Sequence, residues 1–589
     1  MLSSPVRSAS LFLLFTSALS EFTPCPLLGP FYPPFKVDIN DKAIESSLKN
    51  LTAKFDDLMR TGDGENGPVN INTTSFSIAV FSTNEGTAED EPFYWQYHYT
   101  APDYKSGPNK PGNVTKDSIY RIGGLTEIFT VWSLLRTLGD GIFNDPVTKY
   151  LPELSNGSST HVSIRQTRWS DITVGQLASH MGGIPRDYCS NDLTSEADIS
   201  KAGLPEHSDF DRPCCSSDSK CSQKEFLRQL SKQAPIANPG QTPIYSNMAF
   251  QLLGYIIERR TGHSFKSVLR NQILDPLELN ETSIFAPLDT ETAVIPVNQK
   301  ASGWLAHLPG TEASTSMFSS LDNLARVGQA IMDSTLLTTS QTNRWLKPAT
   351  HTANPANSIG YPFVIYSGGD YPKTSPMVDV YTLLSNEGYQ ESLYSSYMGL
   401  VPDWGVGYAI LSADTESPAD LNAHADYMQE ALDGVVKSAV TQAAENYCGA
   451  YASASSSNSS LSIDYTERVG WGIYIDEFVS NGQDYRETLS KLLGVSHETD
   501  LSIRLYPTRL SEEYKAGSKQ SFRAALQDMT ELADNDTPTC VSWMHVDRYQ
   551  YNGHGLDEFI FTLNAEGKVV SVEVPALEVT LEKEKEKEK

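Results

Sequence analysis

One strongly apolar helical repeat, preceded by two short strand-like runs, most constrains what this chain can fold into. Residues 76–81 and 94–99 are rich in β-branched and aromatic side chains, which is typical of strands. Apolar residues then recur at helical spacing and predict a buried helix that ends near Gly139. Strands and helices in this order favour a fold of layered α and β elements. The repeat consists of Leu125, Ile128, Phe129, Trp132 and Leu135.

Further elements fit the same layered arrangement. Residues 41–60 place apolar side chains on one face of a predicted amphipathic helix, and a second such helix is predicted over about 247–261. A pair of strands is predicted over 395–402 and 406–412. The apolar face of the first helix comprises Ile44, Leu48, Leu51, Phe55 and Leu58.

The pattern changes near residue 440, which divides the chain into unequal parts. We expect a main domain over 21–440 and a separate β-rich domain over 445–579, because short strands and turns dominate after 445. Residues 581–589 alternate Glu and Lys with almost no apolar content. We therefore expect 580–589 to be a solvated tail.

Charge and composition exclude several classes of partner. The net charge is −28, which repels phosphate backbones and anionic membrane surfaces, so we expect no nucleic-acid partner. No internal stretch reaches the roughly 18 consecutive apolar residues that span a bilayer. CxxC and paired-His spacings are absent, and we expect neither a metal nor another cofactor.

The N-terminus has the pattern of a secretory signal peptide. Arg7 precedes an apolar run over 11–15, and small residues over 18–20 suit cleavage before Glu21. We expect residues 1–20 to be removed and the protein to be secreted. Glycosylation then becomes relevant, because Asn-X-Ser/Thr sites recur along the chain. They lie at Asn50, Asn72, Asn113, Asn156, Asn280, Asn458 and Asn535.

Seven cysteines suggest disulfides in a secreted chain. Cys448 and Cys540 bracket the β-rich domain, and we predict that they form a disulfide. Cys25 is left over. Between 189 and 221, Cys189 is expected to pair with one of three others, and the choice stays open. Those three are Cys214, Cys215 and Cys221.

Several sequence blocks resemble the penicillin-recognising serine hydrolases. The first block covers 120–130, and the most specific one combines Pro239-Gly240 with Tyr245-Ser246-Asn247 and Leu253-Gly254-Tyr255. Their order over most of 75–415 resembles class C β-lactamases, esterases and D-aminopeptidases, and secreted fungal-type members among them. The resemblance implies a β-lactamase/transpeptidase-like fold, in which helices flank an antiparallel sheet, here followed by a small β-rich domain.

The family's nucleophile is missing at the matching positions. The resemblance implies a Ser-X-X-Lys motif at the start of the buried helix, where the lysine takes the proton of the serine that forms the acyl-enzyme. Here Gly124 and Glu127 occupy those two positions. Ser-X-X-Lys also occurs over 46–49 and 217–220, but neither segment begins the buried helix. The acyl-enzyme mechanism therefore cannot run as it does in the family.

A second family motif is kept and a third is altered. Tyr245 can act as an acid or base and Asn247 can bind substrate, although the motif can also be a helix start with Asn247 as its cap. The third motif should be Lys or His, then Ser or Thr, then Gly, and its nearest match is 386–388, which ends at Gly388. We expect Gly124, Glu127, Tyr245 and Asn247 to converge on one pocket with the segment near Gly388 as its far wall.

Three functions remain open. In the first, Tyr245 and Glu127 catalyse a non-covalent isomerisation, cyclisation or dehydration of a small molecule, a reaction that would suit secondary metabolism. In the second, the protein is an inactive binding or scaffold protein. In the third, it is a hydrolase or transesterase with an unrecognised nucleophile. Loss of the cationic groups favours a neutral or apolar ligand. The sequence leaves substrate and oligomeric state open.

Overall fold

The computed structural model describes residues 25–84, 92–107, 112–155, 164–187, 203, 222–288, 290–306, 310–368, 378–385, 392–454, 458–465, 471–530 and 541–585. The chain divides into two compact units. The larger unit comprises Lys36–Gly369 and Met377–Ser438, and the smaller unit comprises Met1–Phe35, Asp370–Pro376 and Ala439–Lys589.

The first described residues belong to the smaller unit, whereas we expected all of 21–440 to form one domain. Two contacts explain the difference. Phe31 packs edge-on against Tyr506 with ring centroids 6.5 Å apart, and the hydroxyl of Ser542 donates to the Pro26 carbonyl at 3.2 Å. The N-terminal segment therefore packs on residues that are distant in sequence.

The larger unit is built on an antiparallel sheet of eight strands in the order β4-β3-β12-β11-β10-β9-β8-β7. Strands predicted over 76–81, 94–99, 395–402 and 406–412 are confirmed as β3, β4, β11 and β12. The pairing of β3 with β12, from Thr74 opposite Asp414 to Ser82 opposite Val406, is the longest in this sheet. The strands are β3 (Thr74–Ser82), β4 (Trp95–Tyr99), β7 (Thr350–His351), β8 (Asn357–Ile359), β9 (Val364–Gly368), β10 (Val378–Ser385), β11 (Tyr394–Val401) and β12 (Val406–Asp414).

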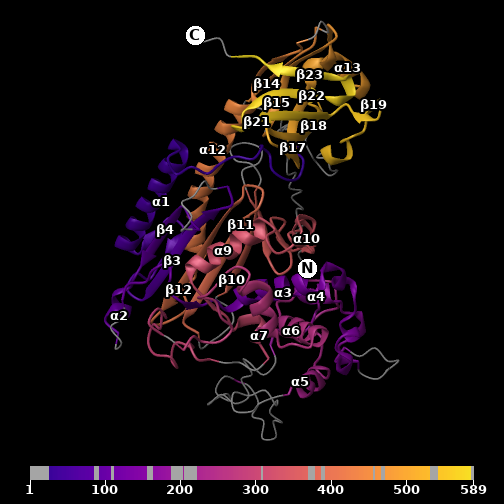
Figure 1. The fold of residues 1–589 in the computed structure, drawn as a ribbon. Coiled ribbons are helices and arrows are strands. Elements are labelled where there is room, and N and C mark those ends of the chain that lie inside the picture. Colours follow the sequence, from indigo (N-terminus) through magenta and orange to yellow (C-terminus); the bar gives the residue numbers. More distant parts are fainter. Residues whose placement is uncertain are drawn as a thin grey trace, which may run out of the picture. The chain divides into compact units, whose positions relative to one another are not determined.

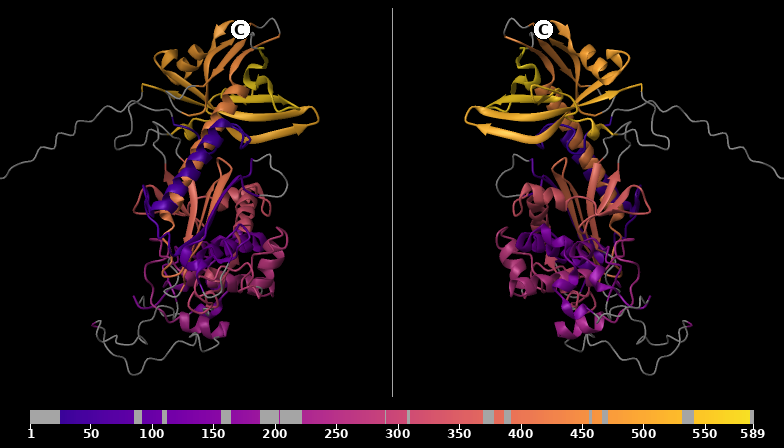
Figure 2. Two further views of the ribbon diagram at one scale, coloured as in Figure 1. Left: turned by 90° about the vertical axis from the view of Figure 1, so that its left-hand side faces the viewer. Right: turned by 90° about the vertical axis from the view of Figure 1, so that its right-hand side faces the viewer.

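One face of this sheet is covered by α1 (Lys42–Thr61) and the first part of α12 (Met428–Tyr447), which run side by side (Figures 1 and 2). The helix predicted over 41–60 is confirmed as α1. Asp41 caps it by accepting the amide of Ala43 at 2.8 Å. Its buried stripe, including Phe55, packs on Phe76 of β3 with ring centroids 6.1 Å apart.

The opposite face packs on a larger group of helices and contains the main core. At its centre is α3 (Thr126–Leu138), in which every residue from Thr126 to Leu135 is buried. α9 (Leu321–Met332) lies directly on β3 and β12 (Figure 1). The remaining helices of this unit are α2 (Pro102–Lys105), α4 (Val174–Ala178), α5 (Gln223–Leu230), α6 (Asn247–Thr261), α7 (Phe265–Leu269), α8 (Glu312–Thr315), α10 (Thr339–Trp345) and α11 (Asn422–Asp426).

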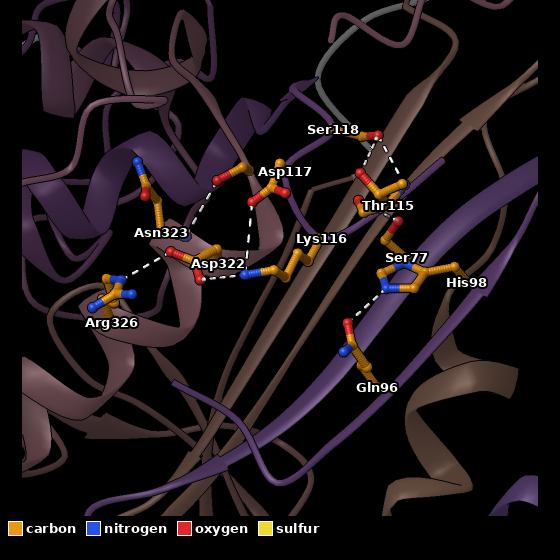
Figure 3. Close-up of polar contacts among 11 residues, drawn as sticks. Ser77, Gln96, His98, Thr115, Lys116, Asp117, Ser118, Asp322, Asn323 and Arg326 are labelled. Atoms are coloured by element: carbon orange, nitrogen blue, oxygen red, sulfur yellow. Dashed lines mark hydrogen bonds and ion pairs between the residues drawn. The ribbon is translucent and has the colours of Figure 1, made fainter. Parts of the chain in front are cut away.

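A polar cluster fastens the segment that leads into α3 (Figure 3). Asp322, on the first turn of α9, accepts from Nε of Arg326 at 2.8 Å, and its carboxylate lies 3.7 Å from Nζ of Lys116. The amide of Asp322 also donates to the Lys116 carbonyl at 3.2 Å. Because Lys116 precedes β5 (Tyr120–Arg121), these contacts fix the approach of the chain to the start of α3.

The smaller unit is a closed β-barrel. Its strands follow the order β14-β13-β23-β22-β21-β18-β17-β15-β16, and an additional β14–β15 pairing closes the sheet. Aromatic rings fill the core, for example Phe522 and Phe561 with centroids 4.9 Å apart. The elements are β13 (Gly449–Ala452), β14 (Ser460–Asp464), β15 (Ile473–Ser480), β16 (Gln483–Asp484), α13 (Tyr485–Leu493), β17 (Leu501–Tyr514), β18 (Gly517–Asp528), β21 (Glu558–Asn564), β22 (Val569–Val574) and β23 (Val579–Lys583).

The expected tail over 580–589 is wrong in its first residues. β23 pairs with both β13 and β22 inside the barrel sheet. Leu581 is fully buried, and Nζ of Lys583 donates to the Asn446 carbonyl at 2.7 Å. Leu581 supplies the inward-facing position of β23, so the neighbouring charged residues do not prevent strand formation here.

The predicted disulfide between Cys448 and Cys540 is wrong, because Cys448 is a free cysteine. Cys25, left over in our count, is disulfide-bonded. Bracketing a domain in sequence does not bring two thiols together in space. Cys540 and the cysteines over 189–221 lie outside the described residues.

The structure bears on the expected absence of a membrane span and on the exposure of the predicted glycosylation sites. Among the helices of the described ranges, none has the length and apolar composition to cross a membrane. The five sequon asparagines that fall in these ranges are all solvent-exposed, whereas Asn156 and Asn535 lie outside them. Glycosylation stays a prediction. The five are Asn50, Asn72, Asn113, Asn280 and Asn458.

We predict that Cys25 pairs with Cys540. The hydrogen bond from Ser542 to Pro26 brings the residue after Cys25 beside a position two residues after Cys540, and disulfides need Cα atoms within about 7 Å. Peptide mapping without reduction should recover a cross-linked peptide containing both cysteines. The Cys448 peptide, alkylated after denaturation without reductant, is the internal control. A cross-link from Cys25 to the 189–221 region would contradict the prediction.

We also predict that buried His424 makes the larger unit acid-sensitive. Burial lowers the pKa of His424 to about 4, below the ordinary 6.5, against the opposing charge of Asp420. The unfolded chain then takes up a proton before the folded chain does, so stability falls as pH decreases from about 6.5 toward 4, by roughly 3 kcal/mol in total. Urea unfolding of His424→Leu across this range should show a shallower pH dependence.

Exposed His263, changed to Gln, is the matched control and should leave the pH dependence unaltered. An unchanged slope in His424→Leu would show that other groups cause the acid sensitivity.

Candidate active site

The start of α3 holds the two positions assigned to the missing serine and lysine. A 3₁₀ turn, η1 (Gly123–Leu125), leads into α3, so Gly124 and Glu127 lie one turn apart on a buried segment. The hydroxyl of Thr126 donates to the Gly123 carbonyl at 2.6 Å and accepts the amide of Met317 at 3.1 Å. The left-handed backbone, φ 45°, falls on Gly123 and not on Gly124.

Glu127 and Tyr245 meet directly. Glu127 is fully buried, and the hydroxyl of Tyr245 donates to its Oε1 at 3.2 Å. The same hydroxyl lies 3.2 Å from Oδ1 of Asn247. A phenol has one proton, so Tyr245 donates to one of these acceptors at a time. Three of the predicted site residues therefore form one hydrogen-bonded group.

His180 completes this group, and the sequence analysis missed it. Its Nε2 lies 3.4 Å from Oε2 of Glu127, and its ring stacks on Tyr245 with centroids 4.7 Å apart. This contact does not reach hydrogen-bond geometry, and Oε2 has no hydrogen-bond partner among the residues that the structure describes. A histidine within the family-like block over 172–180 was the available signal, but its role depends on tertiary contacts.

The Tyr245-Ser246-Asn247 turn is fixed by Ser246. Its hydroxyl accepts the amide of Ala249 at 3.2 Å as the N-cap of α6 and donates to the Pro185 carbonyl at 2.7 Å. Ser246 and not Asn247 is therefore the cap. Asn247 is fully buried, and its Nδ2 donates to Oδ1 of Asp187 at 2.8 Å.

Burial dominates the electrostatics of the pair. It raises the pKa of Glu127, and the contacts with His180, Tyr245 and Arg186 oppose this rise. Burial, followed by the charge of Glu127, raises the pKa of Tyr245 well above 10, while the Arg186 guanidinium, 4.7 Å from the ring centre, acts against it. At neutral pH Tyr245 is thus a phenol that donates a hydrogen bond.

The structure describes only part of the region predicted for the third motif. Gly388 and the rest of 386–388 lie outside the described residues. The strand that precedes them, β10, packs against η1 together with β11. Across the described parts of the chain, no three His, Cys, Asp or Glu residues are grouped as metal ligands would be. The geometry is thus a cluster of proton donors and acceptors.

Comparisons with known families cover most of the chain. Residues 95–433 match the beta-lactamase family model. Residues 439–585 match a model described as a beta-lactamase-like C-terminal domain. The two matches fall on either side of the boundary between the larger and smaller units at Ser438 and Ala439.

Individual relatives resemble the chain over nearly its full length. A beta-lactamase-like protein of Arthroderma benhamiae is 28% identical over 569 residues, which is 91% of each chain. A probable hydrolase of Cochliobolus lunatus is 22% identical and covers 92% of this chain and 89% of its own. Among solved structures, a class C beta-lactamase is 15% identical, covers 67% of this chain and 97% of its own, and has a TM-score of 0.47.

We predict that covalent chemistry can be rebuilt at the start of α3. Gly124→Ser with Glu127→Lys places a hydroxyl and an amine one helical turn apart, so a fluorophosphonate probe, which phosphonylates an activated serine with loss of fluoride, should label the double variant and not the unmodified protein. Intact mass measures the labelling, and thermal unfolding checks the fold. Glu127→Lys alone, which has no added hydroxyl, is the matched control. Equal labelling of a serine in the unmodified protein would reveal another nucleophile.

Proposed function

Because the chain belongs to the beta-lactamase family, we propose that it is a small-molecule enzyme in which acid–base catalysis by Glu127 and Tyr245 replaces the acyl-enzyme. The observation that carries this proposal is the 3.2 Å hydrogen bond between the Tyr245 hydroxyl and Oε1 of Glu127. It joins the kept family tyrosine to the residue that stands at the lysine position.

Glu127 and Tyr245 have complementary roles in a proton transfer, one as the base and the other as a hydrogen-bond donor. Glu127 as a carboxylate accepts a proton from a weakly acidic C–H or O–H group of the substrate. Tyr245, with its raised pKa, stays protonated, and its single proton turns from Oε1 of Glu127 to the substrate oxygen on which negative charge develops. Isomerisations, cyclisations and dehydrations that begin with loss of such a proton can each use this combination. The same base can activate water, which links the proposal to relatives named as probable hydrolases.

Substrate class and location complete the proposal. A glutamate in place of the family lysine disfavours anionic substrates, so we propose a small neutral or apolar molecule, as in secondary metabolism. The net charge of −28 supports the absence of nucleic-acid partners. The N-terminal signal pattern and the five exposed sequons support a secreted glycoprotein.

One observation favours a second function, an inactive binding or scaffold protein. The side chain of Glu127 is 0% exposed. In this second function, the hydrogen bond from Tyr245 to Glu127 has the single role of stabilising the start of α3. In that case the buried group of Glu127, Tyr245 and His180 would be structural. The two functions differ in whether Glu127 exchanges protons with a bound molecule.

We predict that the protein accelerates proton abstraction from 5-nitrobenzisoxazole, a neutral apolar probe that opens on loss of one C–H proton. Glu127→Gln should lower the rate by roughly 100-fold, because an amide cannot act as the base. The rate should rise with pH through the raised pKa of Glu127 and then level off, since only the carboxylate is active. Absorbance of the released phenolate measures the rate.

Glu258→Gln is the matched control. Glu258 is another carboxyl whose pKa is raised by burial, but it lies at the far end of α6, about 16 Å along the axis from Asn247. Its variant should keep the full rate. A rate that is the same in all three proteins would favour the binding-protein function.

A further inference from the structure

The backbone of His180 is held in an uncommon conformation. His180 follows α4 and has φ 57°, in the left-handed region that few residues other than glycine adopt. Its amide donates to the Leu177 carbonyl at 3.3 Å, and its carbonyl accepts the amide of Ile244 at 2.8 Å. The residue is therefore fixed from both sides, one of them the segment that carries Tyr245.

The imidazole ring is fixed as firmly as its backbone. It is 6% exposed and lies between two aromatic rings, Tyr245 with centroids 4.7 Å apart and Phe250 with centroids 5.1 Å apart. Phe250 and Tyr245 both come from the start of α6. The direction in which the ring nitrogens point is thus set by packing.

The hydrogen bonds then assign the proton on the ring. The amide of Ser246 donates to Nδ1 of His180 at 3.2 Å, so Nδ1 is an acceptor and carries no proton. A neutral imidazole with a bare Nδ1 carries its proton on Nε2. This N–H faces Oε2 of Glu127 at 3.4 Å.

We infer that His180 is a positioning residue that orients Glu127 and holds it as a carboxylate, an inference that rests on the proposed function of Glu127 as the base. Tyr245 donates to Oε1 at 3.2 Å, and Nε2 of His180 lies 3.4 Å from Oε2 in a close contact outside hydrogen-bond geometry, so a fixed group lies beside each carboxylate oxygen. The base is then aligned before a substrate arrives, which is how preorganised sites reduce the barrier.

The other charged groups around Glu127 do not replace this role. Arg186 lies over the Tyr245 ring, and its Nε is 3.4 Å from Oδ2 of Asp187, so Asp187 offsets part of its charge. Burial raises the pKa of Glu127, and His180 is the strongest influence in the opposite direction. Removing its N–H should therefore favour protonated Glu127 over a wider pH range.

The test is the pH at which Glu127 becomes protonated, read from the infrared carbonyl band of its acid form. The band is identified by its loss in Glu127→Gln. In His180→Phe, which keeps an aromatic ring in the stack but no donor, the band should persist to a higher pH, by about one unit or more. The pH midpoint of the 5-nitrobenzisoxazole rate should move by the same amount. His180→Gln, which restores an N–H donor, should recover part of the shift.

Phe81→Leu is the control for loss of core packing, because it removes a buried ring from β3 of the same unit and should leave the midpoint unchanged. An unchanged band in folded His180→Phe, checked by thermal unfolding, would overturn the inference and leave the proposed function intact. A shifted band in a protein without any Glu127-dependent rate would support the inference and count against the proposed function.

Discussion

The site in the larger unit depends on one constraint: the carboxylate of Glu127 lies in the first turn of a completely buried helix and must be accommodated by neighbouring segments. Because every residue from Thr126 to Leu135 is buried, Glu127 cannot reach bulk water and needs donors from neighbouring segments. Tyr245 lies just before α6 and donates to Oε1, and His180 lies just after α4 with its Nε2 3.4 Å from Oε2, so this one side chain contacts the segments next to two other helices. The local geometry of the site follows from that requirement.

Much of the fold was predictable because its elements have strong local patterns. The run of β3 is visible as a cluster of β-branched and aromatic residues, and the helical stripes of α1 and α3 repeat with a period of 3.6 residues. Glu127, Tyr245 and Asn247 were found from the order of family-like blocks, and their contacts confirm that the blocks meet. His180 could not be assigned in this way, because its role depends on a left-handed backbone and on rings from another helix.

Two errors have physical reasons of the same kind. Cys448 and Cys540 were paired from their positions in sequence, yet the contact between Ser542 and Pro26 shows that the N-terminal segment approaches the region after 540. β23 was taken as a tail because its charged residues hid an alternation in which Leu581 points inward. Both errors concern contacts between distant segments, which composition does not report.

The additional pairing between β14 and β15 has a consequence for how the smaller unit behaves at high concentration. An open sheet ends in unpaired amides and carbonyls, which can recruit a strand from another molecule. In the described strands of the barrel, β14 pairs with β13 on one side and β15 on the other, and β16, which extends the sheet, has only two residues. Closure thus removes the edge at β14, and the backbone that stays open in the described strands is the outer part of β17, which pairs with β15 only at Arg504 and Leu505.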